Sequence, residues 1–178
     1  MSRIVCIGDS LTWGFPFGPA VSWVNRIAEE TEHEVINRGV NGHTTTDMVR
    51  RFPREVLEAR PTHVVIMGGT NDVVWRESHD RIVWNLRHMV EEARAAGIRV
   101  ILGLPIPIDE PEMERRLERV RQWMRAYAAE QGLDLIDFDA CMRGPHGEMR
   151  QELFLDGAHP SREGWAAMAE AVDLSVFE

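Results

Sequence analysis

Short apolar runs alternate along this chain with segments in which apolar residues recur every three or four positions. The runs are bounded by turn residues and predict five β-strands, at 4–7, 34–37, 63–67, 98–102 and 133–138. Helical spacing is found at 22–31, on both sides of Pro53, at 82–93, at 113–127 and from Ser161 to about 172. Gly97 and Gly132 follow two of these segments and are predicted to end them as helices.

The order of these elements predicts how they assemble. Strands that are continuously apolar and separated by helices indicate a parallel sheet covered on both faces. Right-handed crossovers then give a three-layer α/β/α fold, with a doubly wound, five-stranded parallel sheet. The sequence has no repeat and no linker, so residues 1–178 are predicted to form a single domain. In such folds ligands bind beyond the carboxyl ends of the strands.

Charge and composition exclude some classes of partner. The net charge of -9 argues against nucleic-acid binding, which needs a basic surface. It also argues against a polybasic membrane patch, and no apolar run is long enough to cross a bilayer. No leader precedes the first strand, so we expect a cytoplasmic protein without a stable membrane anchor. Cys6 and Cys141 are expected to be free thiols, and the pattern leaves the oligomeric state open.

Two polar motifs at opposite ends of the chain predict nucleophilic catalysis. Gly8-Asp9-Ser10-Leu11 ends the first strand and places a serine where the carboxyl end of the strand opens. Asp156-Gly-Ala-His159-Pro160 offers an imidazole with a carboxylate three residues before it. A serine hydroxyl is a weak nucleophile without a base, and an imidazole oriented by a carboxylate is such a base. The candidate catalytic residues are therefore Ser10, His159 and Asp156.

Two further motifs supply candidate donors for an oxyanion hole. Gly42 lies in Asn37-Arg-Gly-Val-Asn-Gly-His43, after the second strand, where a glycine lets the backbone N–H approach a ligand closely. Asn71 lies in Gly69-Thr-Asn-Asp72, after the third strand, and carries a side-chain amide. Together with the Ser10 backbone N–H they would hold a developing negative charge. Each is equally compatible, by itself, with a simple turn residue.

These four motifs, in this order, resemble the blocks of the SGNH hydrolases, also called the GDSL esterase/lipase family. The resemblance spans nearly the whole chain and implies a flavodoxin-like fold. It also implies hydrolysis of esters or thioesters without a metal or other cofactor. The position after Gly42, often Asp in that family, is His43 here. Asp156 is the least essential member of the triad by this resemblance, because in the family a backbone carbonyl or water can partly orient the imidazole.

Several other residues near the motifs can be interpreted as functional or as structural. Trp13, Phe15 and Trp75 follow the catalytic motifs and are candidates for a substrate pocket, although packing at the rim explains them equally well. Asp9 and Asp72 are expected to bind nearby backbone N–H groups, and no zinc-ligand spacing occurs. Trp84 and Trp123 lie on helical stripes and are expected in the core.

The predicted function is a serine esterase that acts on small or short-acyl carboxylic esters through an acyl-serine. The short chain leaves no room for a large lid, which favours small-molecule substrates in an open cleft. The same site would also serve a thioesterase, a lysophospholipase, a carbohydrate deacetylase or an acyltransferase, because loop shape sets specificity. A phosphate- or flavin-binding module is the non-enzymatic alternative, but it leaves Asn71, Asp156 and His159 unexplained.

Overall fold

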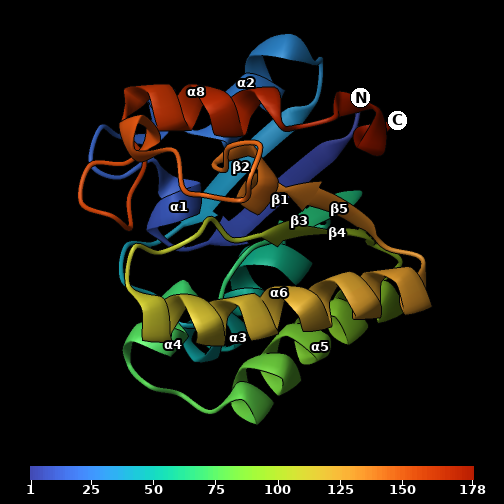
Figure 1. The fold of residues 1–178 in the computed structure, drawn as a ribbon. Helices are drawn as coiled ribbons and strands as arrows, with labels where there is room; N and C mark the ends of the chain where they lie inside the picture. The colour runs from blue at the N-terminus through green and yellow to red at the C-terminus, as the bar shows by residue number, and fades with distance from the viewer.

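The computed structural model describes residues 1–178 and contains a five-stranded parallel sheet between two layers of helices (Figure 1). The strands are β1 (Arg3–Gly8), β2 (Glu34–Gly39), β3 (His63–Ile66), β4 (Arg99–Leu104) and β5 (Asp134–Asp137). Their order across the sheet is β2-β1-β3-β4-β5, and every neighbouring pair is parallel. This is the flavodoxin-like, doubly wound order, so the predicted fold class is confirmed.

Helices cover both faces of the sheet. They are α1 (Ser10–Trp13), α2 (Trp23–Glu30), α3 (Thr45–Phe52), α4 (Thr70–Val74), α5 (His79–Ala95), α6 (Pro111–Gln131), α7 (Phe138–Cys141) and α8 (Arg162–Glu170). α2 and α8 pack together on one face, while α3, α5 and α6 cover the other (Figure 1). Shorter helical turns occupy Pro19–Val21, Pro53–Leu57, Gln151–Leu153 and Leu174–Phe177.

Strand β1 shows how the sequence builds two cores from one sheet. Successive side chains of a strand point to opposite faces. Ile4 and Cys6 join the apolar cluster under α2 and α8, whereas Val5 and Ile7 join the cluster under α3, α5 and α6. All four are fully buried, which explains why the strand reads as a continuous apolar run. Cys6 and Cys141 are both free thiols.

The predicted helix ends agree well with the structure. Ser161 caps α8 by accepting a hydrogen bond from the Gly164 N–H, and α6 ends at Gly132 in the left-handed conformation. The expectation for Trp84 is wrong. Trp84 is 48% exposed, because it lies on the face of α5 opposite the buried stripe, where it stacks against His88 beneath Arg81.

The fifth strand is also shorter than predicted. Phe138 begins α7, because the Asp137 side chain accepts the Ala140 N–H and turns the chain into a helix. The remaining strands agree with the prediction to within two residues at each end. Trp123 is partly buried and packs against the core cluster, where it stacks on Tyr127.

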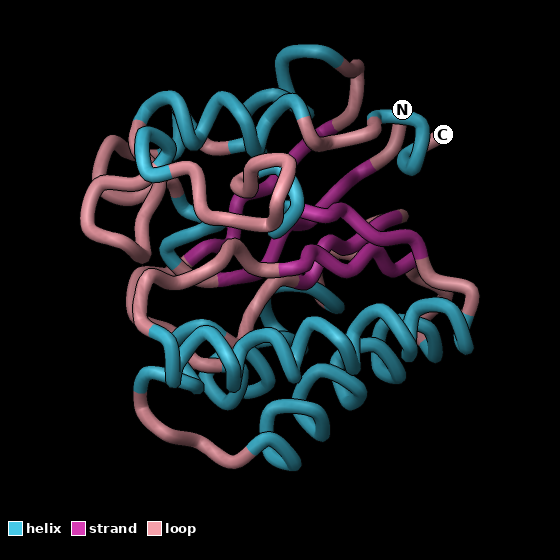
Figure 2. The backbone as a smooth tube through the Cα atoms, viewed as in Figure 1, coloured by secondary structure: helices cyan, strands magenta, loops and turns pink.

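The parallel topology brings the candidate motifs to one edge of the sheet. The loops that follow the strands gather on the left in Figure 2, beyond the carboxyl ends of the strands. Helix α1 starts directly after β1, α3 follows β2, and α4 follows β3. None of the helices combines the length and the hydropathy that crossing a bilayer requires.

Candidate active site

Three side chains from the two ends of the chain form a continuous hydrogen-bonded series. The Ser10 Oγ lies 3.3 Å from the His159 Nε2, and the His159 Nδ1 lies 2.8 Å from the Asp156 Oδ2. Asp156 is an acceptor, so the neutral imidazole holds its proton on Nδ1 and leaves Nε2 free to accept the Ser10 proton. This is the arrangement that a base-activated serine requires.

The loop that carries His159 is built around Asp156. Its Oδ1 accepts the backbone N–H groups of Ala158 and His159, at 3.0 and 2.7 Å, while Oδ2 holds the imidazole. Partial burial acts to raise the pKa of Asp156, but the hydrogen bonds from His159 and Ala158 hold it below its ordinary value. The carboxylate therefore stays charged and fixes both the loop and the ring.

A second loop supports the first from outside. The backbone N–H of Asp109 donates to the Gly157 carbonyl at 2.7 Å, so the proline-rich segment after β4 braces the histidine loop. That segment is held in turn by Arg121, whose buried guanidinium donates to the Pro105 and Ile106 carbonyls. Arg121 also pairs with Glu114 at 2.8 Å. The sequence carried a signal for it, because an arginine occupies the apolar stripe of α6.

Asp9 caps the helical turn that carries the candidate nucleophile, Ser10. It lies buried before α1, where its side chain accepts the Leu11 N–H at 2.8 Å, as the sequence suggested. Burial raises the pKa of Asp9 to about 6, and the nearby Asp72 acts in the same direction. The helical turn that starts at Ser10 is thus fixed by a carboxyl group that is costly to ionise.

The raised pKa of Asp9 makes stability depend on pH. The folded protein holds this proton up to about pH 6, whereas its ordinary pKa is 3.8, so stability falls as pH rises between those values. Asp9→Asn keeps an acceptor for Leu11 but removes the charge. We expect it to gain up to about 3 kcal/mol over wild type between pH 4 and 7.5, measured by urea unfolding. A difference that does not change with pH would contradict this role.

The candidate oxyanion donors lie on the loops after β2 and β3. Gly42 is exposed, with a φ of 80°, and its N–H has no acceptor in the protein. A side chain would strain this backbone conformation, although nothing within 4 Å would obstruct it. The Ser10 N–H also lacks an acceptor, and the Asn71 amide donates to the His43 carbonyl at 2.8 Å. The Asn71 amide therefore keeps one free N–H.

A buried polar network joins the two loops. Asp72 accepts the Thr45 N–H at 2.9 Å and the Thr45 hydroxyl at 2.6 Å, which ties the start of α3 to α4. Asn85 reaches across from α5 and donates to the hydroxyls of Thr45 and Thr46. The network fixes Gly42 and Asn71 relative to each other through their neighbours. Sequence reasoning missed Asn85, although an asparagine on the apolar stripe of α5 was a visible signal.

The three aromatic candidates for a substrate pocket differ in their contacts with the candidate catalytic residues. The Phe15 ring contacts the His159 imidazole, with centroids 4.6 Å apart, and the Trp165 indole N–H donates to the Phe15 carbonyl. Trp13 is the last residue of α1, and its backbone lies against Gly39. A side chain at position 39 would clash with that backbone. Trp75 is 75% exposed after the last residue of α4, and no hydrogen bond or aromatic pair joins it to Ser10 or His159.

The candidate catalytic residues lie outside the principal cavities of the protein. None of the five principal cavities is lined by Ser10, Asp156 or His159. No group of three or more histidine, cysteine, aspartate or glutamate side chains is arranged to hold a metal ion. The site itself presents the Ser10 hydroxyl, the His159 imidazole, the Asp156 carboxylate and the free N–H donors.

The chain is similar to known proteins over most of its length. The model of the GDSL-like Lipase/Acylhydrolase family matches residues 6–167. Among curated proteins, Esterase TesA of Pseudomonas aeruginosa is 28% identical over 175 residues, covering 95% of this chain and 85% of that protein. The lipoprotein YqeF of Bacillus subtilis is 38% identical over 120 residues, or 60% of this chain, but the match spans only 49% of YqeF.

A solved structure of a G-D-S-L family protein from Desulfitobacterium hafniense superposes with a TM-score of 0.90. It is 28% identical in sequence, and the superposition covers 99% of both chains. The likeness therefore extends over all five strands and their helices, well beyond the short motifs. The cellular location stays a prediction, because one of the relatives is named a lipoprotein.

Proposed function

The chain belongs to the GDSL-like lipase and acylhydrolase family, and we propose that it is a serine esterase that hydrolyses small or short-acyl carboxylic esters. One observation carries the proposal, namely the series from Ser10 through His159 to Asp156 at 3.3 and 2.8 Å. The name of TesA, an esterase aligned over nearly the whole chain, supports the same reaction class. Family membership also favours an enzyme over a phosphate- or flavin-binding module.

The first half of the reaction acylates the serine. As the Ser10 Oγ attacks the ester carbonyl carbon, its proton passes to the His159 Nε2, and the carbonyl oxygen becomes an oxyanion. Asp156 stabilises the imidazolium through the bond to Nδ1. The tetrahedral intermediate then collapses: the bond to the alkoxy oxygen breaks, and His159 returns the proton to the departing alcohol.

The second half releases the acid by the same steps with water as the nucleophile. Water attacks the acyl carbonyl carbon while His159 accepts a proton from it. The bond between that carbon and the Ser10 Oγ then breaks. The serine recovers its proton from His159 and the carboxylic acid leaves. The partial exposure of the His159 side chain, 28%, supports this step, because water can reach the imidazole.

The oxyanion would be held by the Ser10 N–H, the Gly42 N–H and the Asn71 amide. Two of these donors have no acceptor in the protein, and the third keeps one N–H free. Donors that are fixed before the reaction stabilise a developing charge without reorganising. Their unused hydrogen-bonding capacity supports the assignment.

Removing the Asn71 amide is expected to lower kcat by about 10²–10³-fold with little change in KM, because this donor acts mainly in the transition state. The test is steady-state kinetics of Asn71→Ala on p-nitrophenyl acetate. Asn85→Ala is the comparison, since it disturbs the supporting network without removing an oxyanion donor. Equal changes in kcat and KM for Asn71→Ala would instead indicate a ground-state contact with the substrate.

The proposed preference for short acyl groups rests on the position of Ser10 outside the principal cavities. No principal cavity adjoins Ser10, so a long acyl chain has little apolar surface to bury, apart from half-buried rings such as Phe15. Trp13, Phe15 and Trp75 are proposed to border the substrate. We expect kcat/KM on p-nitrophenyl esters to be highest for two to six acyl carbons and to fall beyond eight. A maximum at ten or more carbons, or a strong preference for matched thioesters, would overturn the proposed substrate class.

A further inference from the structure

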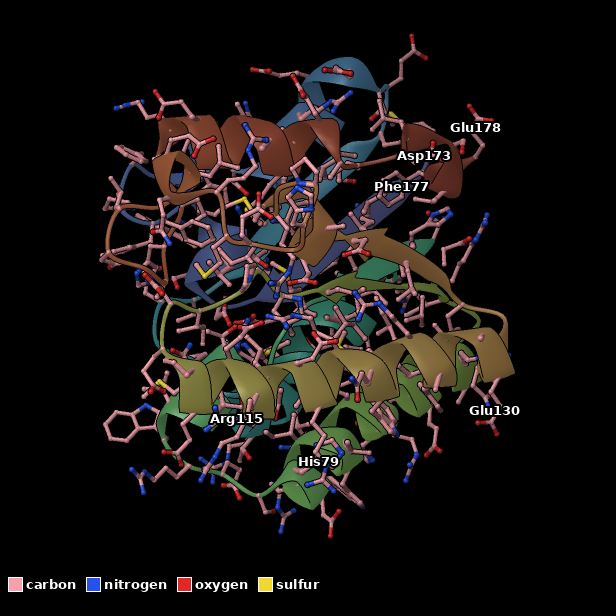
Figure 3. The ribbon with its side chains drawn as sticks, viewed as in Figure 1. His79, Arg115, Glu130, Asp173, Phe177 and Glu178 are labelled. Atoms are coloured by element: carbon pink, nitrogen blue, oxygen red, sulfur yellow. The ribbon has the colours of Figure 1, made fainter.

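The side chain of Arg51, in the last turn of α3, lies where β1, β2 and the loop that carries Gly42 meet. It is only 11% exposed. Its Nη2 donates to the Gly8 carbonyl at 2.6 Å, and its Nη1 donates to the Arg38 carbonyl at 2.8 Å. Helix α3 lies on the same face of the sheet as α6, which carries the label Arg115 in Figure 3. Arg51 therefore joins the carboxyl ends of two strands at the edge where the candidate site lies.

The same guanidinium holds the residue that follows Gly42. The Arg51 Nε donates to the His43 Nδ1 at 3.1 Å, and Nδ1 must be the acceptor, because a guanidinium has only donors. The His43 N–H donates to the Val40 carbonyl at 3.2 Å and closes the turn that contains Gly42. Arg51 thus fixes the ring of a residue whose backbone belongs to that turn.

The other two candidate oxyanion donors are connected to the same contacts. The His43 carbonyl accepts one N–H of the Asn71 amide at 2.8 Å, which leaves the other N–H free. Gly8 lies two residues before Ser10 at the end of β1. Each of the three donors is therefore within two residues, or one hydrogen bond, of a residue that Arg51 holds.

The charge of Arg51 is balanced away from the candidate site, by Glu55 in the turn after α3, at 2.6 Å. With the bonds to Gly8, Arg38 and His43, the guanidinium has four acceptors in one orientation. None of its hydrogen bonds goes to Ser10 or His159. A planar fork with several acceptors fixes their spacing, which a lysine ammonium does not reproduce.

We propose that Arg51 is a positioning residue for the oxyanion hole: it fixes the spacing of the three candidate donors and contacts no reacting atom. Its effect on the rate rests on the proposed function, because the donors act on an oxyanion formed at Ser10. Geometry matters at this level, since a displacement of about 1 Å can lower a rate about 100-fold.

The kinetic test is a double-mutant cycle on p-nitrophenyl acetate. Arg51→Met is expected to lower kcat about 10–100-fold with little change in KM. In the Asn71→Ala background the same substitution is expected to cost at least about threefold less, because one donor that Arg51 positions is already missing. Equal losses in both backgrounds, or a loss that lies mainly in KM, would overturn the proposal.

Three further variants separate positioning from charge and from folding. Arg51→Lys is expected to lose nearly as much kcat as Arg51→Met, and wild-type kcat in it would show that charge alone suffices and overturn the proposal. Arg50→Met is the matched control, an exposed arginine on the same helix, and should keep wild-type kcat. His43→Ala keeps the bonds to Gly8 and Arg38 and tests the same route if Arg51→Met does not fold. It is expected to lower kcat about three- to tenfold, and no loss would contradict the route through the ring.

An NMR measurement tests the positioning without turnover. In ¹⁵N-labelled Arg51→Met, the Gly42 amide and the Asn71 side-chain amide are expected to shift and to exchange faster with water, whereas Arg50→Met should match wild type. Unchanged signals in folded Arg51→Met would overturn the proposal. Changed signals, in a protein whose wild type shows no Ser10-dependent ester hydrolysis, would support the positioning of the donors and overturn only the proposed function.

Discussion

Replacing Ser10 with alanine is expected to lower kcat by roughly 10⁵–10⁶-fold, because no other group at the site supplies a nucleophile that can be acylated. The fold should be unaffected. The Ser10 hydroxyl contacts only the His159 ring, and the Asp9 side chain still caps the following helical turn. The measurement is kcat on p-nitrophenyl acetate together with the melting temperature of the variant.

The control for this change is Ser175→Ala, in the C-terminal turn, where the hydroxyl contacts only Asp173. It is expected to retain wild-type kcat. Ester hydrolysis by folded Ser10→Ala within tenfold of wild type would exclude the acyl-serine pathway. In that case water, and not the Ser10 hydroxyl, would have to attack the ester carbonyl.

Replacing His159 with alanine is expected to be nearly as damaging, with a loss of roughly 10⁴–10⁶-fold in kcat. Without the imidazole, nothing accepts the Ser10 proton, and nothing protonates the alcohol that leaves. Added imidazole is expected to restore part of the activity in His159→Ala but none in Ser10→Ala. Rate measurements with increasing imidazole separate a lost base from a distorted site.

His146→Ala is the matched control, since His146 is exposed on a loop and its side chain makes no hydrogen bond. Its activity should equal that of wild type. If His159→Ala kept more than a tenth of the wild-type activity, another group would have to act as the base. Asp9 and Asp72, both buried near the site, would then be the groups to test.

Much of the fold could be predicted because each buried strand is a short apolar run that ends at a turn. The run of residues 4–7 predicted β1, and its abrupt end placed Ser10 at the carboxyl edge of the sheet. Short helices such as α1 and α4 were not predicted, because four or five residues show no helical period. Trp84 was misplaced because it lies two residues from Ile82 and Leu86, off the apolar stripe of α5, and that stripe is buried as its spacing indicates.

The candidate site, too, could be predicted only in part. Ser10 and His159 lie 149 positions apart, and only the order of the motifs suggested that they meet. Their supports were not predictable, since the bond from Asp109 to Gly157 and the network of Thr45, Asp72 and Asn85 depend on packing between loops. That Ser10, Asp156 and His159 line none of the principal cavities likewise appears only in three dimensions.

The most direct test of the account is to label the protein with a fluorophosphonate and locate the adduct by mass spectrometry. This reagent reacts rapidly with a serine that a neighbouring base activates, whereas an ordinary serine hydroxyl is a poor nucleophile. The account predicts one adduct, on Ser10, that is absent from Ser10→Ala and strongly reduced in His159→Ala. Folded wild-type protein without an adduct, or with an adduct on another serine, would contradict the claim that Ser10 is the activated nucleophile.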